Sequence, residues 1–293
     1  MTEQERQEML AEMKGDKEGR KAKFWSPGAN FEGTKTIRIL PPLKKLNEKK
    51  FYFSHKVHFI GGRPFEDLEQ TILDEEGNVV QESQPDPVNA LVRKLYRTSE
   101  RGSDEWKLAG TLKSKQRYIS RIILRDKENP ETEVQPVFFE YGPTVYNILY
   151  HIMTETDFGI IVDPKEGRDF HLTKQGVGRQ SKYETSTPAA EKSPIFKDAT
   201  KLKQMFDNAM EMKYSSLIEV PSREEKEIAL REFLGEDLGS ENSSSVYDMS
   251  SSKSASPEKP KQSKPEPTPE PTPSAEEDSS EEDDIDAILS EMV

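Results

Sequence analysis

The stretch "RYISRIIL", residues 117–124, decides the fold class of this chain. Its side chains alternate between two faces with the period of a β-strand. One face carries aromatic and aliphatic side chains: Tyr118, Ile122 and Leu124. Arg117 and Arg121 lie on the opposite face. The alternation therefore predicts a strand that has two arginines on one side and an apolar surface on the other.

Four further segments predict short strands in the same way. They are 34–40 ("TKTIRIL"), 51–59 ("FYFSHKVHF"), 134–141 ("VQPVFFEY") and 168–175 ("RDFHLTKQ"). Pro41-Pro42 ends the first of them, and Gly61-Gly62 turns the chain after the second. The polar run "DKENPETE" (126–133) predicts the turn that follows residue 124. We therefore expect a β-rich body with at least five strands and no internal repeat.

Helical spacing of apolar residues is found mainly in the second half of the chain. The expected helices are 143–155, 197–214 and about 222–234. Pro143 stands at a first helical position. Ser222 and Glu225 form a capping box, and Gly235 ends the helix that they begin. We interpret the apolar stripes of these helices as core packing.

The net charge of -13 is unevenly distributed along the 293 residues. Residues 241–293 hold 14 acidic and 4 basic residues, a net charge of -10, whereas residues 20–200 hold 29 basic and 26 acidic residues, a net charge of +3. A mildly basic body with an acidic arm favours a nucleic-acid-binding protein. The Ser/Pro-rich segment that begins near Gly239 cannot bury enough apolar surface to fold, so residues 239–293 are predicted to be disordered.

Motifs of catalysis and metal binding are absent from the sequence. It contains no Walker loop, GxGxxG, GxSxG or HExxH motif and no cysteine, so we expect neither an enzyme nor a cofactor. His55 and His58 are three residues apart, which places them on opposite faces of a strand rather than around one metal ion. No apolar run approaches the roughly 18 residues of a membrane helix, and the acidic N-terminus is unlike a secretory signal.

The strongest functional signal is "WKLAGTLKSKQRYISRIILRDK", residues 106–127, with seven basic residues and one acidic residue. Binding of single strands needs this mixture, because Lys and Arg contact phosphates while exposed rings stack on bases. A solvated basic strand edge, which protects against aggregation, is the alternative interpretation. The segment 172–183 adds a second, glycine-containing basic cluster. The residues predicted to contact DNA are Arg38, Lys56, Arg63, Trp106, Lys113, Lys115, Arg117, Tyr118, Arg121, Phe139, Tyr141, Lys174, Arg179, Lys182 and Tyr183.

A β body of five strands with a basic, aromatic face is typical of nucleic-acid-binding OB-folds. We therefore predict a mainly β fold with helices: an OB-fold-type five-stranded barrel with accessory helices, flanked by an N-terminal arm and the acidic tail. In the arm, Thr2 and Glu5 form a capping box before a narrow apolar stripe.

At this point the chain resembles the T-even phage type of single-stranded DNA-binding protein, the helix-destabilising protein of phage replication. The resemblance runs through nearly the whole chain in order, at modest identity. It rests on "TIRILPP" (36–42), "KSKQRYI" (113–119), "YGPTVYNIL" (141–149), "EGRDFHLTKQ" (166–175) and, most specifically, "DDIDAILSEM" (283–292).

The resemblance implies three parts: an arm for self-association along DNA (1–20), an OB-type core (21–238) and an acidic tail (239–293). The tail would recruit replication, recombination and repair proteins of the polymerase, helicase-loader, primase and recombinase types. The resemblance also implies cooperative coating of single strands in the cytoplasm of an infected bacterial host. Carried over by position, the phosphate contacts would be Lys113, Lys115 and Arg117, and the stacking or cleft-lining rings would be Tyr118, Phe139 and Tyr183, with Tyr96 and Trp106 as looser matches.

The chain departs from the family in two respects. Well-known members hold a zinc ion with one histidine and three cysteines, whereas Asp86 and Asn89 stand here where a CxxC motif would lie. We therefore expect no structural zinc, and a short helix near 84–96 packed through Val88, Leu91, Val92 and Leu95 in its place. The basic cluster within the family's first few residues is also missing, which puts cooperativity by that route in doubt.

The last residues of the tail keep an apolar stripe among acids. Ile285, Ile288, Leu289 and Met292 have helical spacing, beside Asp283, Asp284 and Asp286. We interpret this segment as a partner-binding helix that is disordered when free and folds on binding, with the acids steering the encounter. Incidental apolar residues in a disordered end are the alternative.

Two alternatives for the whole chain remain open. One is a protein-interaction adaptor whose acidic tail mimics nucleic acid and whose β body binds protein; it predicts no DNA binding even without the tail. The other is a metal-dependent nuclease, which predicts magnesium-dependent cleavage.

Overall fold

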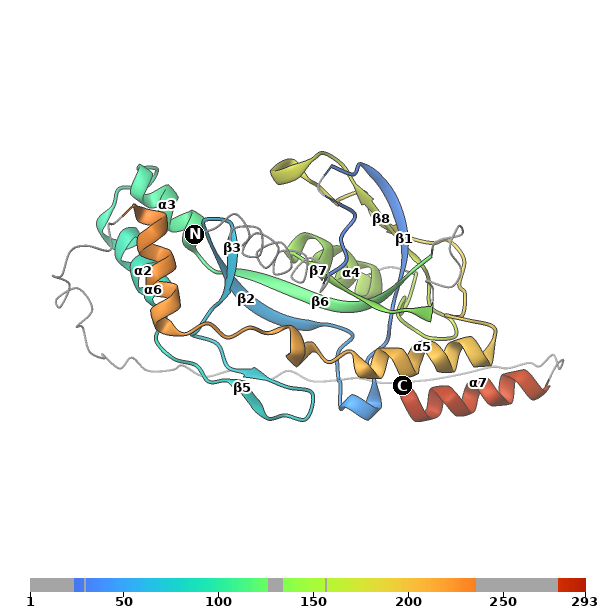
Figure 1. Ribbon diagram of the computed structural model, residues 1–293. Coiled ribbons are helices and arrows are strands. Elements are labelled where there is room, and N and C mark those ends of the chain that lie inside the picture. The colour runs from blue at the N-terminus through green and yellow to red at the C-terminus, as the bar shows by residue number, and fades with distance from the viewer. Residues whose placement is uncertain (1–23, 29, 126–133, 156, 236–278) are drawn as a thin grey trace, which may run out of the picture.

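The computed structural model describes residues 24–28, 30–125, 134–155, 157–235 and 279–293. A twisted sheet crosses the centre of the molecule, with helices along its sides and at its ends (Figure 1). The predicted N-terminal arm (1–20), the turn 126–133 and most of the tail lie outside the described residues.

The main sheet contains seven strands, and every pairing between them is antiparallel. They are β1 (Gly33–Ile39), β2 (Phe53–Ile60), β3 (Arg63–Glu66), β6 (Lys115–Leu124), β7 (Val137–Tyr141), β8 (Phe170–Lys174) and β9 (Thr187–Pro188). A separate hairpin pairs β4 (Ile72–Leu73) with β5 (Val79–Gln81). The five predicted strands are confirmed, with ends shifted by a few residues.

The long strand β6 organises the sheet because it pairs with three others. Its first half pairs with β2, from Lys115 opposite Val57 to Ile119 opposite Phe53. Its second half pairs with β1, and β7 lies along its other edge. The main path runs β3-β2-β6-β1-β8-β9, so β3 and β9 are its two ends. Since the described strands never close on themselves, the prediction of a five-stranded barrel is wrong, and the sheet is open.

Six α-helices occur among the described residues: α2 (Pro87–Thr98), α3 (Asp104–Leu112), α4 (Pro143–Glu155), α5 (Ala199–Glu211), α6 (Arg223–Leu234) and α7 (Ser279–Met292). The capping box of Ser222 and Glu225 is formed, and Gly235 ends α6 with a φ of 73°. Helix α2 begins after Asp86, whose carboxylate accepts from the N–H groups of the first turn. The sequence did not indicate α3, because only Ala109 and Leu112 of this short helix are buried.

The helices cover different parts of the sheet. The largest core cluster joins α4 to β1, β6, β7 and β8. A second cluster packs α2, α3 and α6 together at the end of β2, and a third packs α5 beneath β1 and β6 (Figure 1). Short 3-10 turns η1 (Lys44–Leu46), η3 (Gly178–Gln180) and η4 (Tyr214–Leu217) lie in the connections. None of the described helices combines the length and apolar character needed to span a bilayer.

The end of the predicted disordered tail is a helix packed on the body. In α7, Leu289 and Met292 are buried in the cluster that contains α5 and η1, and Ile285 and Ile288 pack against it. Ion pairs join Asp286 to Lys165 and Glu291 to Lys45. The prediction of disorder is therefore corrected for residues 279–293, because the apolar stripe finds a matching surface within the same chain.

Candidate nucleic-acid interface

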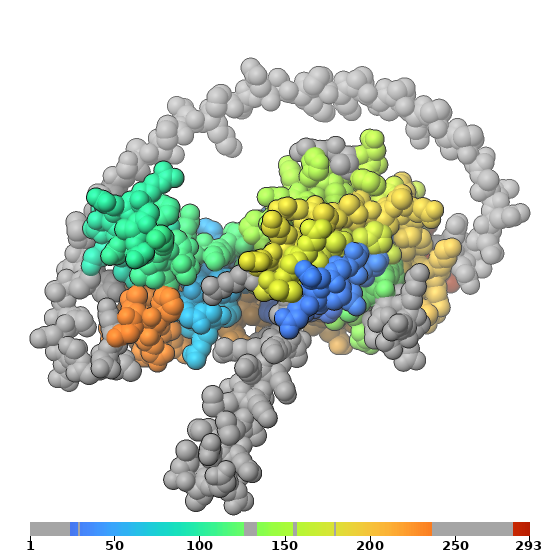
Figure 2. Space-filling view, turned by 90° about the horizontal axis from the view of Figure 1, so that it is seen from above, coloured from blue at the N-terminus to red at the C-terminus, as the bar shows by residue number. Residues whose placement is uncertain are grey.

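One face of the molecule is hollowed between two lobes. Figure 2 shows α2 and α3 on one side and the region of α4, β8 and η3 on the other, with β2 and β6 in the floor between them. The lobes are held apart by β6, which runs from the α2–α3 group into the core beneath α4 (Figure 1). An open trough of this kind accommodates an extended polymer rather than a small molecule.

Four of the predicted basic residues are exposed where β6 leaves α3. Lys113 follows the last turn of α3, and Lys115 begins β6 with its Nζ 5.5 Å from the centre of the Phe59 ring. Lys56 lies on β2 opposite Gln116, and Arg63 opens β3. The pairing of β2 with both β3 and β6 brings these cations, distant in sequence, to one end of the sheet. The register places Lys56 on the opposite face of the sheet from Lys115.

Arg117 belongs to the same region, but its charge already has a partner. Its Nη2 lies 3.0 Å from Glu140 on β7. His55, which pairs with Arg117 across the strands, has its Nδ1 2.9 Å from Glu66 and its Nε2 3.7 Å from Glu140. Burial lowers the pKa of His55, but the two carboxylates outweigh burial and raise it to about 9. Burial raises the pKa of Glu140, but His55 and Arg117 bring it down to about 2.

A cluster of tyrosines lies on the other face of β6 from these charges, where the strand meets α4. Tyr118 stacks on Tyr146 with ring centres 4.1 Å apart and planes at 4°. Tyr52 meets both rings edge-on, and its hydroxyl lies 3.2 Å from that of Tyr146. Tyr150, one turn further along α4, continues the stack and is 53% exposed. These four rings are the aromatic platform of the interface.

Three rings of this platform were not predicted as site residues: Tyr52, Tyr146 and Tyr150. Tyr146 and Tyr150 are spaced i, i+4, so they share one face of α4. The signal was present in the sequence, but it was hidden because the neighbouring apolar stripe of the same helix explained the pattern as core packing. Burial raises the pKa of both Tyr52 and Tyr118, so these phenols stay neutral at physiological pH.

The other predicted surface residues are more scattered. Trp106 on α3 packs against Tyr96, at 5.5 Å and 65°, with Arg101 over its ring. Lys182 is exposed on the loop after β8, and Tyr183 is half-buried against the main core. Arg179 lies in η3, and its side chain is outside the described residues.

Five predicted contacts are buried in the described structure. They are Arg38 (0% exposed), Arg121 (2%), Phe139 (3%), Tyr141 (2%) and Lys174 (3%). Arg38 donates to the carbonyl oxygens of Asp163 and Ser193 at 2.9 and 2.7 Å, and burial lowers its pKa to about 10. Lys174 donates to the Gly28 carbonyl at 2.7 Å.

Phe139, Tyr141 and Arg121 of this buried set are also enclosed by the protein. Phe139 and Tyr141 belong to the main core cluster, and Arg121 donates to the Met212 carbonyl. These five side chains are buried within the fold and are not available to contact DNA.

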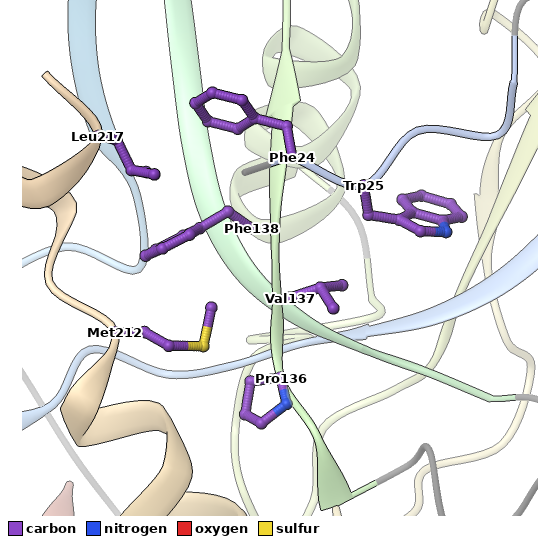
Figure 3. A pocket seen from close by; sticks show the side chains of 7 residues that line it. All are labelled: Phe24, Trp25, Pro136, Val137, Phe138, Met212 and Leu217. Atoms are coloured by element: carbon purple, nitrogen blue, oxygen red, sulfur yellow. The ribbon is translucent and has the colours of Figure 1, made fainter. Parts of the chain in front are cut away.

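An apolar pocket of about 450 Å³ lies on the other side of β7 from the tyrosines. Phe24 and Trp25 come from the segment before β1, Phe138 from β7, and Met212 from the end of α5 (Figure 3). Its lining contains no basic side chain, so it offers a phosphate nothing to bind. The pocket is not part of the candidate interface.

One buried cluster has the composition of a metal site. His58, Asp67 and Asp86 each offer a ligand atom, and these atoms lie within 4.8 Å of one another. The ammonium group of Lys226 forms an ion pair with Asp86 in the same cluster. The zinc ion that the resemblance implies does not fit this arrangement, because it would come into contact with a fully buried positive charge.

The described tail residues lie far from the hollow. Asp284 and Asp286 are exposed on α7, and the side chain of Asp283 is outside the described residues. Helix α7 lies below the sheet in Figure 1, whereas the hollow opens upward.

An open sheet with exposed lysines, a platform of stacked tyrosines and a trough between two lobes defines a nucleic-acid-binding protein. Comparison with known families agrees with this class. The family described as "gp32 DNA binding protein like" matches residues 32–233, which is more than half of the chain. The chain therefore belongs to this family of DNA-binding proteins, which confirms the predicted family, while the loss of the zinc ion stays a prediction. No curated protein matches the chain.

Proposed function

We propose that this protein coats and protects single-stranded DNA, removes its secondary structure, and recruits replication, recombination and repair proteins through its C-terminal helix. The observation that carries the proposal is the combination of exposed cations and stacked tyrosines beside the hollow, within a domain of a DNA-binding family. Single strands expose both phosphates and base faces, so they satisfy both halves of such a surface.

The strand follows the floor of the hollow in this proposal. Lys56 contacts phosphates in the floor, Arg63, Lys113 and Lys115 contact them at the end of the sheet, and Lys182 extends the basic track at the far lobe. Bases stack on the tyrosines of β6 and α4. Duplex DNA has no unstacked bases to offer, so the aromatic platform selects single strands.

The direct test is a fluorescence titration of oligo-dT into the full chain across a salt series. Trp106 on α3 and Trp25 beside Phe139 are the only tryptophans, so quenching reports on the body of the protein. We expect binding with little sequence preference, in which the logarithm of the affinity falls with the logarithm of salt by about 0.7 for each phosphate contact. If neither the full chain nor a variant without residues 279–293 binds oligo-dT at low salt, the DNA-binding proposal is wrong. The protein-interaction adaptor then replaces it.

The recruiting role rests on the apolar stripe of α7. In the described structure Leu289 and Met292 are buried against the body, so a partner that binds this stripe has to displace the helix first. We propose that the partners are the polymerase, helicase-loader, primase and recombinase types that the resemblance implies, and that the protein acts in the cytoplasm of an infected bacterial host. Leu289→Asp is expected to abolish partner capture while DNA affinity stays unchanged.

Self-association along DNA is proposed for residues 1–20. We expect a variant that begins at residue 21 to bind an oligonucleotide of one site as the full chain does, and to lose affinity only on long poly-dT. Equal binding of both proteins to long DNA would remove the arm from the mechanism.

A further inference from the structure

Lys226 is a fully buried lysine at the contact between three parts of the fold. It comes from α6, and its ammonium group donates to the Glu66 carbonyl of β3 at 2.8 Å. The same group forms an ion pair with the carboxylate of Asp86, the residue that caps α2. One side chain thus joins α6 to β3 and α2, which are separated from it by about 140 to 160 residues in the sequence.

The groups around this ammonium are arranged as ligands of a cation. His58 Nε2 lies 3.5 Å from Asp86 Oδ2 and 3.9 Å from Asp67 Oδ1. His58 is fully buried, and its Nε2 has no hydrogen-bond partner within the part of the chain that the structure describes. Its other nitrogen, Nδ1, lies 2.7 Å from the Leu112 carbonyl, which fixes the ring with Nε2 aimed at the carboxylates.

The two carboxylates are themselves held in place. Asp86 accepts from the N–H groups of Val88 and Leu68, both at 2.8 Å. Asp67 accepts from the side-chain amide of Asn89 at 2.8 Å. An oriented histidine and two oriented carboxylates form the ligand set that zinc and cobalt use, including the carbonyl contact that positions a ligating imidazole.

We propose that this cluster is a cation site whose occupant is the chain's own Lys226, and that removal of the ammonium group turns it into a site for one divalent transition-metal ion. Two buried carboxylates are unfavourable without a compensating positive charge. A lysine provides that charge as part of the chain. Because it is tethered to α6, it also fixes the α2–α3–α6 group that forms one wall of the hollow.

The test uses the untagged full chain and the variants Lys226→Ala and Lys226→Met. Lys201→Ala, at an exposed position of α5, is the matched control. Equilibrium dialysis against Co²⁺ gives the stoichiometry, visible absorption reports the coordination of Co²⁺, and thermal unfolding is followed with Zn²⁺ and with a chelator. The double variant Lys226→Ala/His58→Ala removes the proposed nitrogen ligand.

We expect the natural chain and the Lys201 variant to bind no stoichiometric Co²⁺ and to unfold at the same temperature with Zn²⁺ and with chelator. Lys226→Ala unfolds at a lower temperature than the natural chain, binds one Co²⁺ per chain and regains stability with Zn²⁺. The double variant binds no Co²⁺ and regains no stability with Zn²⁺. Lys226→Met is also less stable than the natural chain. It binds metal more weakly than Lys226→Ala does, because the methionine side chain fills the space that the lysine side chain leaves.

Two results would overturn the proposal. If the natural chain binds one Zn²⁺ and loses stability with chelator, the metal and not Lys226 is the occupant. If Lys226→Ala is folded and binds no metal, the cluster is not a cation site. Should this variant be unfolded as prepared, it is refolded with and without Zn²⁺: recovery with Zn²⁺ alone supports the proposal, and failure in both conditions rejects it.

Discussion

Arg117 and Arg121 lie four residues apart on the same face of β6, yet their surroundings are opposite. The side chain of Arg117 is 26% exposed and forms an ion pair with Glu140. Arg121 is 2% exposed, donates to Glu48 at 2.6 Å and to the Met212 carbonyl, and lies 4.2 Å from the centre of the Tyr214 ring. The alternation of a strand determines on which face of the sheet a side chain lies. Whether that side chain is buried depends on which other segments of the chain pack on the face.

The cover over Arg121 is the segment that joins α5 to η4, about 90 residues further along the sequence. Arg117 lies beyond its reach, at the edge where His55 and Glu140 meet. The same residue type therefore has two surroundings on one strand: Arg121 is part of the core, and Arg117 is a partly exposed, ion-paired residue at the end of the strand.

The largest expected effect distinguishes these roles by stability. Arg121→Met leaves Glu48 buried without its cation and the Met212 carbonyl without its donor, so we expect a loss of about 3–5 kcal/mol in the free energy of unfolding. Arg117→Met, at a partly exposed pair, should lose about 1 kcal/mol or less. Urea denaturation of both variants measures the difference, and equal losses would show that burial does not decide what the two arginines contribute to stability.

The second effect concerns the counterion that Arg117 shares with His55. The pKa of His55 is raised to about 9, above its ordinary value of 6.5. Its contribution to stability is therefore fully present below pH 6.5 and is lost as the pH rises through 9, by about 3 kcal/mol in total.

Urea denaturation between pH 6 and 9.5 measures this loss of stability. Burial lowers the pKa of His58, but Asp67 and Asp86 raise it to about 9 as well, so His58 loses stability in the same window. The variant His55→Gln should therefore reduce the decline by the part that His55 contributes, whereas the control His171→Gln should keep it whole. A decline of equal size in all three proteins would show that His55 makes no contribution to it.

The third effect tests the aromatic platform, which lies on the other face of β6 from Arg117. Tyr150 is half-exposed at the end of the stack, so Tyr150→Ala should weaken binding of oligo-dT by about 1–3 kcal/mol with little change in stability. Tyr150→Phe keeps the ring and should bind as the natural chain does. Unchanged affinity in Tyr150→Ala would place the DNA path away from α4.

Periodicity and caps predicted the regular elements well. The period of two in 117–124 and the capping box at Ser222 are both found in the structure, because short-range geometry determines them. The prediction of a closed barrel was wrong, and Arg38 and Arg121, which were expected to contact DNA, are buried. Both features depend on contacts over long sequence separations. Lys226 is the extreme case: nothing in "REEKEIALREFL" distinguishes it from a solvated lysine of a surface helix.

The smallest effect tests whether Lys113 and Lys115 contact phosphates directly or only add to the net charge of the protein. Lys113→Ala/Lys115→Ala removes two proposed phosphate contacts and should reduce the salt slope of oligo-dT binding by about 1.4, at 0.7 for each contact. Lys201→Ala/Lys203→Ala makes the same change in net charge on α5, below the sheet and away from the hollow (Figure 1). If the control pair reduces the slope equally, the protein attracts DNA through its general field. If only the Lys113/Lys115 pair does, the phosphates lie against the junction of α3 and β6, at the end of the strand where Arg117 is partly exposed and away from the buried Arg121.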